Sequence, residues 1–188
     1  MQTLFFLAFG ELVVCWVLWV LVFVRRHSRP TGQKPVVTAP AARWGILLQG
    51  IGFGLVWSLS LPPAGFWAAT LIGISMLLAP ASVLLAFFAL RHLGKQWRIQ
   101  AGLNEDHELV QTGPYRWVRH PIYTSMLTLF LATGALLTRW PVFLVALALF
   151  LAGTEIRVRT EDGLLASRFG EAFKSYKSRV RAYIPFVR

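Results

Sequence analysis

Cysteine is almost absent from this 188-residue chain, in which Cys15 is the sole example. One cysteine cannot form an internal disulfide framework, and a zinc site built from cysteines is also excluded. Cys15 lies in an apolar run, so we expect a small buried side chain. Charged residues are scarce too, at 14%, whereas 56% of residues are hydrophobic and the mean hydropathy is +0.57. This balance excludes an ordinary soluble domain and predicts an all-α, multi-pass integral membrane protein.

Acidic residues are few: eight Asp and Glu accompany 19 Lys and Arg, giving a net charge of +11. All the basic residues except Arg139 fall in the first loop, in the third loop, or at and beyond the end of the last span. This positive-inside pattern predicts an outside N-terminus and a cytoplasmic C-terminus, in the cytoplasmic membrane if the source is bacterial. The charge indicates topology and contact with membrane lipid; no nucleic-acid recognition motif accompanies it. The pattern rests on five apolar stretches of about 20 residues each, at 3–24, 44–61, 66–90, 121–137 and 141–158.

The first apolar stretch begins without charge and ends at Arg25-Arg26, the reverse of the charge order in a cleaved signal peptide. We therefore expect an uncleaved span. Glu11 lies inside it, and an acid within the membrane is a functional candidate, although Glu11 is also near enough to the outer end to reach interfacial water. In the second stretch, the spacing of Gly50 and Gly54 lets two membrane helices approach closely. We expect that contact within one subunit rather than in a dimer.

A polar segment interrupts the apolar pattern with the sequence Gly-Pro-Tyr-Arg-Trp-Val-Arg-His-Pro-Ile-Tyr, residues 113–123. Pro121 suits the first position of the helix that follows, where its missing N–H is not needed. Arg119 and His120 would then lie at the donor-rich N-terminus of a membrane helix. Such a helix end attracts carboxylates and polar ligands.

A second polar cluster follows the last apolar stretch, and two pairs in it are four residues apart. On one continuous helix Glu155 faces Arg159 and Arg157 faces Glu161. The last two spans are joined by a three-residue turn centred on Arg139, which predicts a tight helical hairpin. The hairpin returns this cluster to the membrane face that holds the Arg-His pair. We therefore predict that the two polar segments meet.

Two further segments complete the pattern. Residues 104–108, Asn-Glu-Asp-His-Glu, could suggest a metal site, but consecutive acids on one loop rarely all point at one ion. We interpret this segment as a solvated turn and expect no metal. Residues 164–180 predict an amphipathic helix that lies on the hairpin or the inner leaflet and closes the site from the cytoplasm.

Residues from the third loop to the end of the chain resemble the isoprenylcysteine carboxyl methyltransferase family, part of a wider group with phospholipid N-methyltransferases. The match covers roughly the last 80 residues, while the first 90 match only as apolar spans. Three positions depart from the family's usual pattern. Asp162 stands where a second Glu is common, and its side chain reaches less far than that of Glu. Phe173 stands where Tyr is common, and Ser125 where Gly is common. The positions that keep the family's order and spacing are Leu109, Gly113-Pro114-Tyr115, Arg119-His120-Pro121, Tyr123, Arg157, Glu161-Asp162, Leu165, Phe169-Gly170, Tyr176 and Ile184-Pro185.

The resemblance implies S-adenosylmethionine as methyl donor, bound between the last two spans and the C-terminal segment. It implies one membrane domain, 1–188, with N-terminal spans of unassigned role in 1–90 and a methyltransferase-like part in 91–188. The acceptor would be a lipid or a lipidated molecule, most simply an isoprenylcysteine carboxylate. Arg119 and Glu161 become catalytic candidates. The residues implied to contact the cofactor are Tyr115, His120, Pro121, Tyr123, Arg157, Glu161 and Asp162.

The chemistry of these residues is compatible with that assignment. Glu161 and Asp162 can accept hydrogen bonds from the amine or ribose, while Arg157, His120 and helix-terminal amides can hold the carboxylate. Tyrosine faces suit adenine or the sulfonium. Arg119 would orient an anionic head group beside the methyl, in a dry site where alignment supplies most of the catalysis.

Other interpretations of the sequence stay open. Arg119 could bind lipid phosphate, and the cluster of Arg157, Glu161 and Asp162 could be an ion network at a helix end. The chain could methylate a phospholipid amine or a small molecule at N or S, or it could be an NADPH-dependent membrane reductase. The acidic pair, which would repel a 2′-phosphate, argues against the reductase. A non-enzymatic membrane subunit is the third class.

Overall fold

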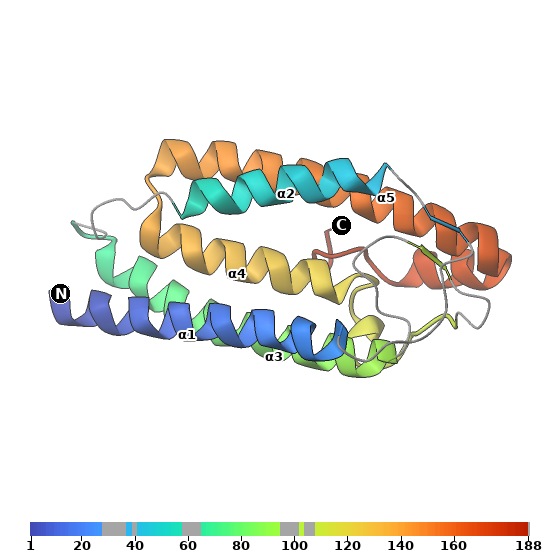
Figure 1. The fold of residues 1–188 in the computed structure, drawn as a ribbon, viewed down its shortest axis with the longest axis horizontal. Coiled ribbons are helices and arrows are strands. Elements are labelled where there is room, and N and C mark those ends of the chain that lie inside the picture. The colour runs from blue at the N-terminus through green and yellow to red at the C-terminus, as the bar shows by residue number, and fades with distance from the viewer. Residues whose placement is uncertain (28–36, 39–40, 58–64, 95–101, 104–107, 188) are drawn as a thin grey trace.

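The computed structural model describes residues 1–27, 37–38, 41–57, 65–94, 102–103 and 108–187. Most of the predicted acidic turn at 104–108 lies outside the described residues. Five helices run roughly side by side along the long axis (Figure 1), and they confirm the predicted all-α class. They are α1 (Gln2–His27), α2 (Ala42–Val56), α3 (Ala68–Leu93), α4 (Pro121–Leu137) and α5 (Trp140–Arg179). Shorter elements are the 3₁₀ turn η2 (Gly113–Arg116) and the antiparallel pair β1 (Val37–Thr38) and β2 (Gly102–Leu103).

The outer surface of the bundle matches a lipid environment. Helices α1, α3 and α5 are long and apolar enough to cross a membrane, and α2 and α4 are shorter apolar helices. Large apolar side chains on their outer faces, such as Leu7, Val14, Leu77 and Val145, are more than half exposed. Exposing so much apolar surface to water would be unfavourable in free energy, whereas exposing it to the hydrocarbon of a bilayer is not. The chain is an integral membrane protein.

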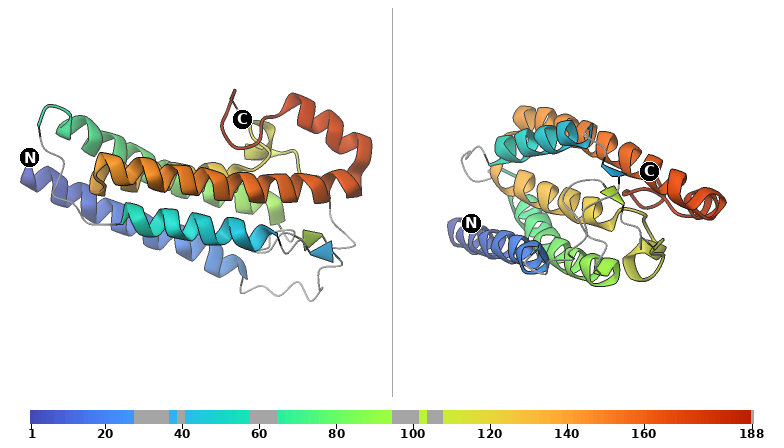
Figure 2. Two further views of the ribbon diagram at one scale, coloured as in Figure 1. Left: turned by 90° about the horizontal axis from the view of Figure 1, so that it is seen from above. Right: turned by 45° about the vertical axis from the view of Figure 1, so that its right-hand side comes forward.

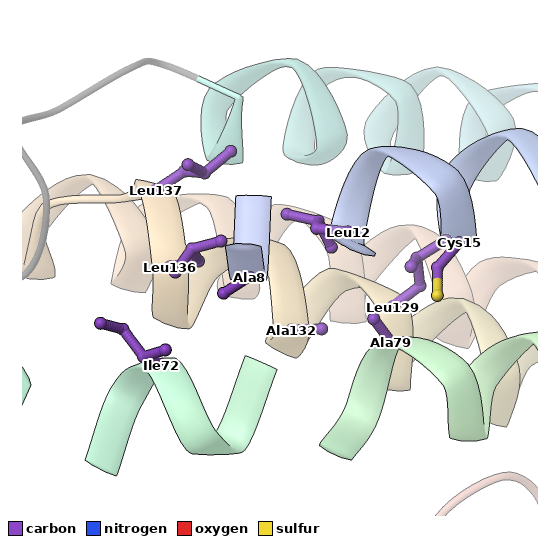
Figure 3. Packing of buried hydrophobic residues seen from close by; sticks show 9 residues of the cluster. All are labelled: Ala8, Leu12, Cys15, Ile72, Ala79, Leu129, Ala132, Leu136 and Leu137. Carbon is purple, nitrogen blue, oxygen red and sulfur yellow. The ribbon is translucent and has the colours of Figure 1, made fainter. Parts of the chain in front are cut away.

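Three of the helices share one apolar core. Leu12 and Cys15 of α1, Ile72 of α3, and Leu129 and Leu136 of α4 point into the same cluster (Figure 3). The predicted burial of Cys15 is confirmed. The core explains why α3 packs against both α1 and α4.

The predicted hairpin of the last two spans is confirmed. Helix α4 ends at Leu137 and α5 begins at Trp140, so the two helices run antiparallel (Figure 1). Large side chains fill the space between them: the rings of Phe130 and Phe150 stack with centroids 4.8 Å apart. At the turn, the Thr138 hydroxyl donates to the carbonyl of Val56, which ties the hairpin to α2 with a 2.7 Å hydrogen bond.

The prediction for Gly50 and Gly54 is wrong. Both face outward, and a Cβ on either would meet nothing within 4 Å. The glycines that bring α2 against α5 are Gly45 and Gly52, together with Gly153 of α5. Helical periodicity explains the difference, because residues 45, 49, 52 and 56 lie on one face of α2 and 50 and 54 do not.

Helix α5 contains a break that folds the C-terminal part back. Gly170 has φ +50° and ψ −121°, values that end the first helix and start another. Beyond it the chain turns and runs back toward the bundle (Figure 2). The prediction of one helix over 164–180 is therefore wrong, because Gly170 divides the segment. The amphipathic pattern beyond the break is confirmed, since Phe173 and Tyr176 are buried while Glu171 and Lys174 are exposed.

Candidate functional site

The polar segment before α4 folds as predicted into a turn followed by a helix start. Gly113 has φ +59°, a value that favours glycine, and a side chain there would collide with the ring of His92 on α3. Helix α4 begins at Pro121. Arg119 and His120 therefore lie at its N-terminus, and both are buried.

The end of the chain pairs with this segment as a short strand would. Val118 and Arg181 form a parallel bridge, the Arg119 N–H donates to the carbonyl of Arg181 and the His120 N–H donates to that of Ala182, both at 2.8 Å. These two amides are thus engaged within the chain and not open to a ligand. The side chains, rather than those amides, must supply any recognition here.

His120 lies between two carboxylates that come from α5. Its Nε2 is 3.0 Å from Asp162 Oδ1, and its Nδ1 is 3.3 Å from Glu161 Oε2. Burial lowers the pKa of His120, but hydrogen bonding and attraction by Asp162 and Glu161 outweigh it and raise the pKa above the ordinary 6.5. An imidazole that donates from both nitrogens must be protonated. These contacts favour the protonated form of His120.

Arg157 and Tyr123 complete the other side of the network. Arg157 Nε donates to the Tyr123 hydroxyl at 2.6 Å, and the hydroxyl in turn donates to Glu161 Oε1. Arg157 Nη2 is 3.5 Å from the same Glu161 oxygen, which confirms the predicted pairing four residues apart. The other predicted pair, Glu155 with Arg159, is also confirmed at 3.3 Å.

Arg119 is the most enclosed cation of the site, with 6% of its surface exposed. Its Nη2 lies 2.9 Å from Asp162 Oδ2, and Nη1 donates to the carbonyls of Val180 and Lys177. Its Nε is buried and has no hydrogen-bond partner within the described part of the chain. This burial, with an ion pair inside the protein, argues against the interpretation of Arg119 as a simple lipid-phosphate anchor.

The network carries more positive than negative charge. The buried cations Arg119 and Arg157 face two carboxylates, Glu161 and Asp162, and the half-exposed Lys177, together with His120 when it is protonated, makes the sum positive. In a poorly solvated site an excess of charge is unfavourable unless a counter-ion joins it. The arrangement therefore suits an additional anionic group, such as a carboxylate.

The predicted meeting of the two polar segments is confirmed. The structure joins six of the sequence-predicted site residues in one network: Arg119, His120, Tyr123, Arg157, Glu161 and Asp162. Tyr115 is buried beside it, and burial first, then the charges of Glu161 and Tyr176, raise its pKa. Pro121 is the buried first residue of α4, where its ring shapes the start of the helix.

The three departures from the family pattern each have a local explanation. Asp162, despite its shorter reach, contacts both Arg119 and His120. The Ser125 hydroxyl is buried, and it accepts a hydrogen bond from the indole N–H of Trp19 in α1 at 3.3 Å. Phe173 is buried and, unlike Tyr, has no hydroxyl that would need a hydrogen-bond partner there. Its ring packs edge-on against that of Tyr176.

Sequence reasoning missed three polar residues next to this network. Lys177 Nζ lies 3.1 Å from Asp162 Oδ2; it falls among the exposed positions of the amphipathic segment, and nothing in the sequence indicates the fold-back at Gly170 that brings it close. Gln49 is buried in α2 and donates to the Thr154 hydroxyl at 2.9 Å. An isolated Gln and Thr in two apolar spans were the only available signal.

The raised pKa of His120 predicts a pH-dependent stability. Its charged contacts stabilise the fold fully below about pH 6.5 and are lost as the pH rises through the higher folded-state pKa. His120→Asn should therefore lower the unfolding temperature most in acid, and its difference from the wild type should shrink as the pH rises above 6.5. Thermal unfolding in detergent between pH 5.5 and 9 measures this. A difference that grows with pH would contradict the protonated, doubly paired imidazole.

Comparison with known proteins identifies the family. The model of the isoprenylcysteine carboxyl methyltransferase (ICMT) family matches residues 71–167, more than half of the chain. The chain belongs to this family. The match includes most of α3, all of α4, and α5 through the polar cluster that holds Glu161 and Asp162.

Curated relatives of this ICMT-family chain are similar over about half of its length. Protein-S-isoprenylcysteine O-methyltransferase of Schizosaccharomyces pombe is 35% identical over 85 residues, 45% of this chain and 36% of the relative. The Homo sapiens protein of that name is 34% identical over 92 residues, 48% of this chain and 32% of the relative. Cobalt-zinc-cadmium resistance protein CzcN of Cupriavidus metallidurans is 34% identical over 98 residues, 52% of this chain and 45% of the relative. The chain thus spans between about a third and a half of the length of the relatives it matches.

Proposed function

We propose that this chain is an integral-membrane S-adenosylmethionine-dependent methyltransferase that methylates a carboxylate on a lipid or lipidated acceptor of isoprenylcysteine type. Family membership supports the reaction class. The observation that carries the choice of acceptor is the position of His120, whose two ring nitrogens both face carboxylates, so that neither is free to act as a base. A carboxylate needs no base before it attacks a methyl group, whereas an ammonium or a thiol must first lose a proton.

The residues present fit the proposed cofactor. Its amine and ribose hydroxyls need acceptors, which Glu161 and Asp162 offer, and its carboxylate suits a site with excess positive charge. The guanidinium carbon of Arg157 lies over the Tyr123 ring, 5.3 Å from its centroid, so this ring already contacts one cation. When bound, S-adenosylmethionine would supply a methyl group on a positively charged sulfur.

The chain's own residues would act by binding and alignment. Arg119 is the residue that we assign to the acceptor carboxylate, because its buried Nε has no hydrogen-bond partner within the described residues. Glu161 would hold the donor in place through its contacts with Tyr123 and Arg157. Burial of the network keeps water away, which strengthens each of these electrostatic contacts. The acceptor's apolar tail would enter from the bilayer between helices.

Methyl transfer to defined acceptors tests the choice of substrate. Purified protein would be given radiolabelled S-adenosylmethionine with an S-prenylated cysteine, with phosphatidylethanolamine, or with a long-chain thiol. We expect label in a base-labile methyl ester of the prenylated cysteine. Label on the phospholipid amine or the thiol instead would overturn the carboxylate assignment and favour an N- or S-methyltransferase.

The reductase alternative has less evidence against it than the sequence suggests. The two carboxylates expected to repel a 2′-phosphate are ion-paired with Arg119, Arg157 and Lys177. Family membership remains the argument for the methyl donor. A non-enzymatic subunit would bind neither cofactor, so a direct binding comparison separates the three classes.

We also propose that the N-terminus is outside and the C-terminus is cytoplasmic. The antiparallel order of the helices puts the ends of α1 and α3, the starts of α2 and α4, and the C-terminal segment at one end of the bundle, and the turn between α4 and α5 at the other (Figure 1). Arg25, Arg43 and Arg91 lie at the first of these ends and Arg139 at the second. Reporter fusions at the two ends should therefore report opposite sides, with the C-terminus inside. Reporters on the same side would require an even number of spans.

A further inference from the structure

The second helix, to which the family resemblance assigns no role, packs directly against the backbone of α5. A Cβ on Gly45 would lie 2.6 Å from the carbonyl oxygen of Gly153, and a Cβ on Gly153 would lie 2.6 Å from that of Gly45. Real Cβ atoms essentially never come so close, so the two helices touch through bare backbone at this point. Neither position can accept a side chain without moving one helix.

The same glycine supports the stem of Arg157. A Cβ on Gly45 would be 2.5 Å from Arg157 Cγ and 3.3 Å from Cδ, so the stem lies flat against α2. The head group then reaches the Tyr123 hydroxyl at 2.6 Å and Glu161 at 3.5 Å. Arg157 is 8% exposed, so its stem has no wide range of alternative positions.

One turn further along, a buried hydrogen bond fixes how the two helices face each other. Gln49 Nε2 donates to Thr154 Oγ1 at 2.9 Å, and Thr154 itself donates to the carbonyl of Phe150. Gln49 lies four residues after Gly45, and Thr154 is next to Gly153. A polar pair inside an apolar interface has few alternative partners, so it specifies one register of α2 on α5.

We propose that α2 is a positioning element of the site. Gln49 fixes the register of α2 on α5, and Gly45 then sets the position of the Arg157 side chain. Through Arg157, α2 also positions Tyr123 and Glu161. The cofactor part of this inference rests on the proposed function, because it takes Arg157 as a cofactor contact. The claim that Gly45 positions the Arg157 side chain rests only on the contacts of Gly45. Gly45 and Gln49 are positioning residues and touch no reacting atom.

Gly45→Ala tests the inference, and α2 offers two matched controls. Gly52→Ala disturbs the same helix interface, where its Cβ would lie 3.0 Å from the Ala146 carbonyl and 3.1 Å from Phe150 Cβ, but it does not touch Arg157. Gly50→Ala faces outward with nothing within 4 Å. We expect S-adenosylmethionine affinity, measured by titration calorimetry in detergent, to fall at least about tenfold in Gly45→Ala. Gly52→Ala and Gly50→Ala should stay within about twofold of the wild type.

A double-mutant cycle based on unfolding measures the contact between Gly45 and Arg157 without any cofactor. Gly45→Ala, Arg157→Ala and the double variant would be compared by thermal unfolding, with Gly52→Ala and Arg157→Ala as the reference cycle. We expect the Gly45 cycle to be non-additive, since removing the Arg157 stem relieves part of the clash, and the Gly52 cycle to be additive. If Gly45→Ala cannot be purified, Gln49→Leu takes its place and should weaken cofactor binding more than Gly52→Ala does.

The outcomes separate the two proposals. Equal loss of affinity in Gly45→Ala and Gly52→Ala, or two additive cycles, would overturn the positioning role. If the wild type binds no S-adenosylmethionine, the proposed function fails, and the stability cycles alone then decide whether Gly45 positions Arg157.

Discussion

Glu161→Lys is expected to abolish S-adenosylmethionine binding while the protein still inserts and purifies. Glu161 accepts a hydrogen bond from Tyr123 and lies 3.5 Å from Arg157 and 3.3 Å from His120. A lysine would add a cation to a cluster that already has excess positive charge, and it would remove the shared acceptor. We expect affinity to fall by about 100-fold or more, which corresponds to roughly 3 kcal/mol at ~1.4 kcal/mol per factor of ten.

The chain supplies a matched control just beyond the helix break at Gly170. Glu171 is 86% exposed on its side chain and pairs with the exposed Lys174, so Glu171→Lys makes the same charge change away from the network. Its cofactor affinity, measured by calorimetry, should stay within about twofold of the wild type. Near-normal affinity in Glu161→Lys would remove Glu161 from the site, and an equal loss in both variants would indicate a general effect of net charge.

Arg119→Ala is expected to lower turnover far more than it weakens cofactor binding. A charge-assisted hydrogen bond from a buried group contributes roughly 1.5–3 kcal/mol, which at about 1.4 kcal/mol per factor of ten is on the order of 10- to 100-fold in rate. Arg119→Lys should recover only part, because an ammonium cannot reproduce the forked contact of a guanidinium with a carboxylate. Turnover at saturating cofactor, measured beside cofactor affinity, separates the two effects.

Arg119 also has a structural role, and the experiment must separate it from substrate binding. The guanidinium contacts Asp162 and the carbonyls of Val180 and Lys177, so Arg119→Ala removes support from the C-terminal segment. Arg116, three residues earlier and exposed, provides the neighbouring control in Arg116→Ala, which should keep full turnover. Full activity in Arg119→Lys would contradict the substrate-orienting role, as would a loss of turnover that merely follows a loss of cofactor affinity.

Local signals were enough to predict the part of the site that lies near the hairpin. The apolar stretches give the helices, Pro121 marks the start of α4, and the short turn at Arg139 forces the last two helices to run antiparallel. A four-residue spacing on one helix then places Arg157 beside Glu161. Because the hairpin leaves few alternatives, the meeting of the two polar segments followed from chain geometry.

Contacts that depend on tertiary packing could not be predicted in this way. The bridge between Val118 and Arg181 is made by backbone atoms 63 positions apart in sequence, and such pairing carries no side-chain signal. Lys177 reaches Asp162 only because the chain folds back at Gly170. The spacing of Gly50 and Gly54 gave a false signal, since a pair of small residues does not say which face of α2 meets another helix.

The most direct test of the proposed function is equilibrium binding of S-adenosylmethionine and NADPH to the detergent-purified wild type, with Glu161→Lys as the negative control. We predict saturable binding of S-adenosylmethionine, no saturable binding of NADPH, and loss of the first in the variant. Binding of NADPH in place of S-adenosylmethionine would contradict the methyltransferase assignment and support a reductase, and binding of neither would support a non-enzymatic membrane subunit.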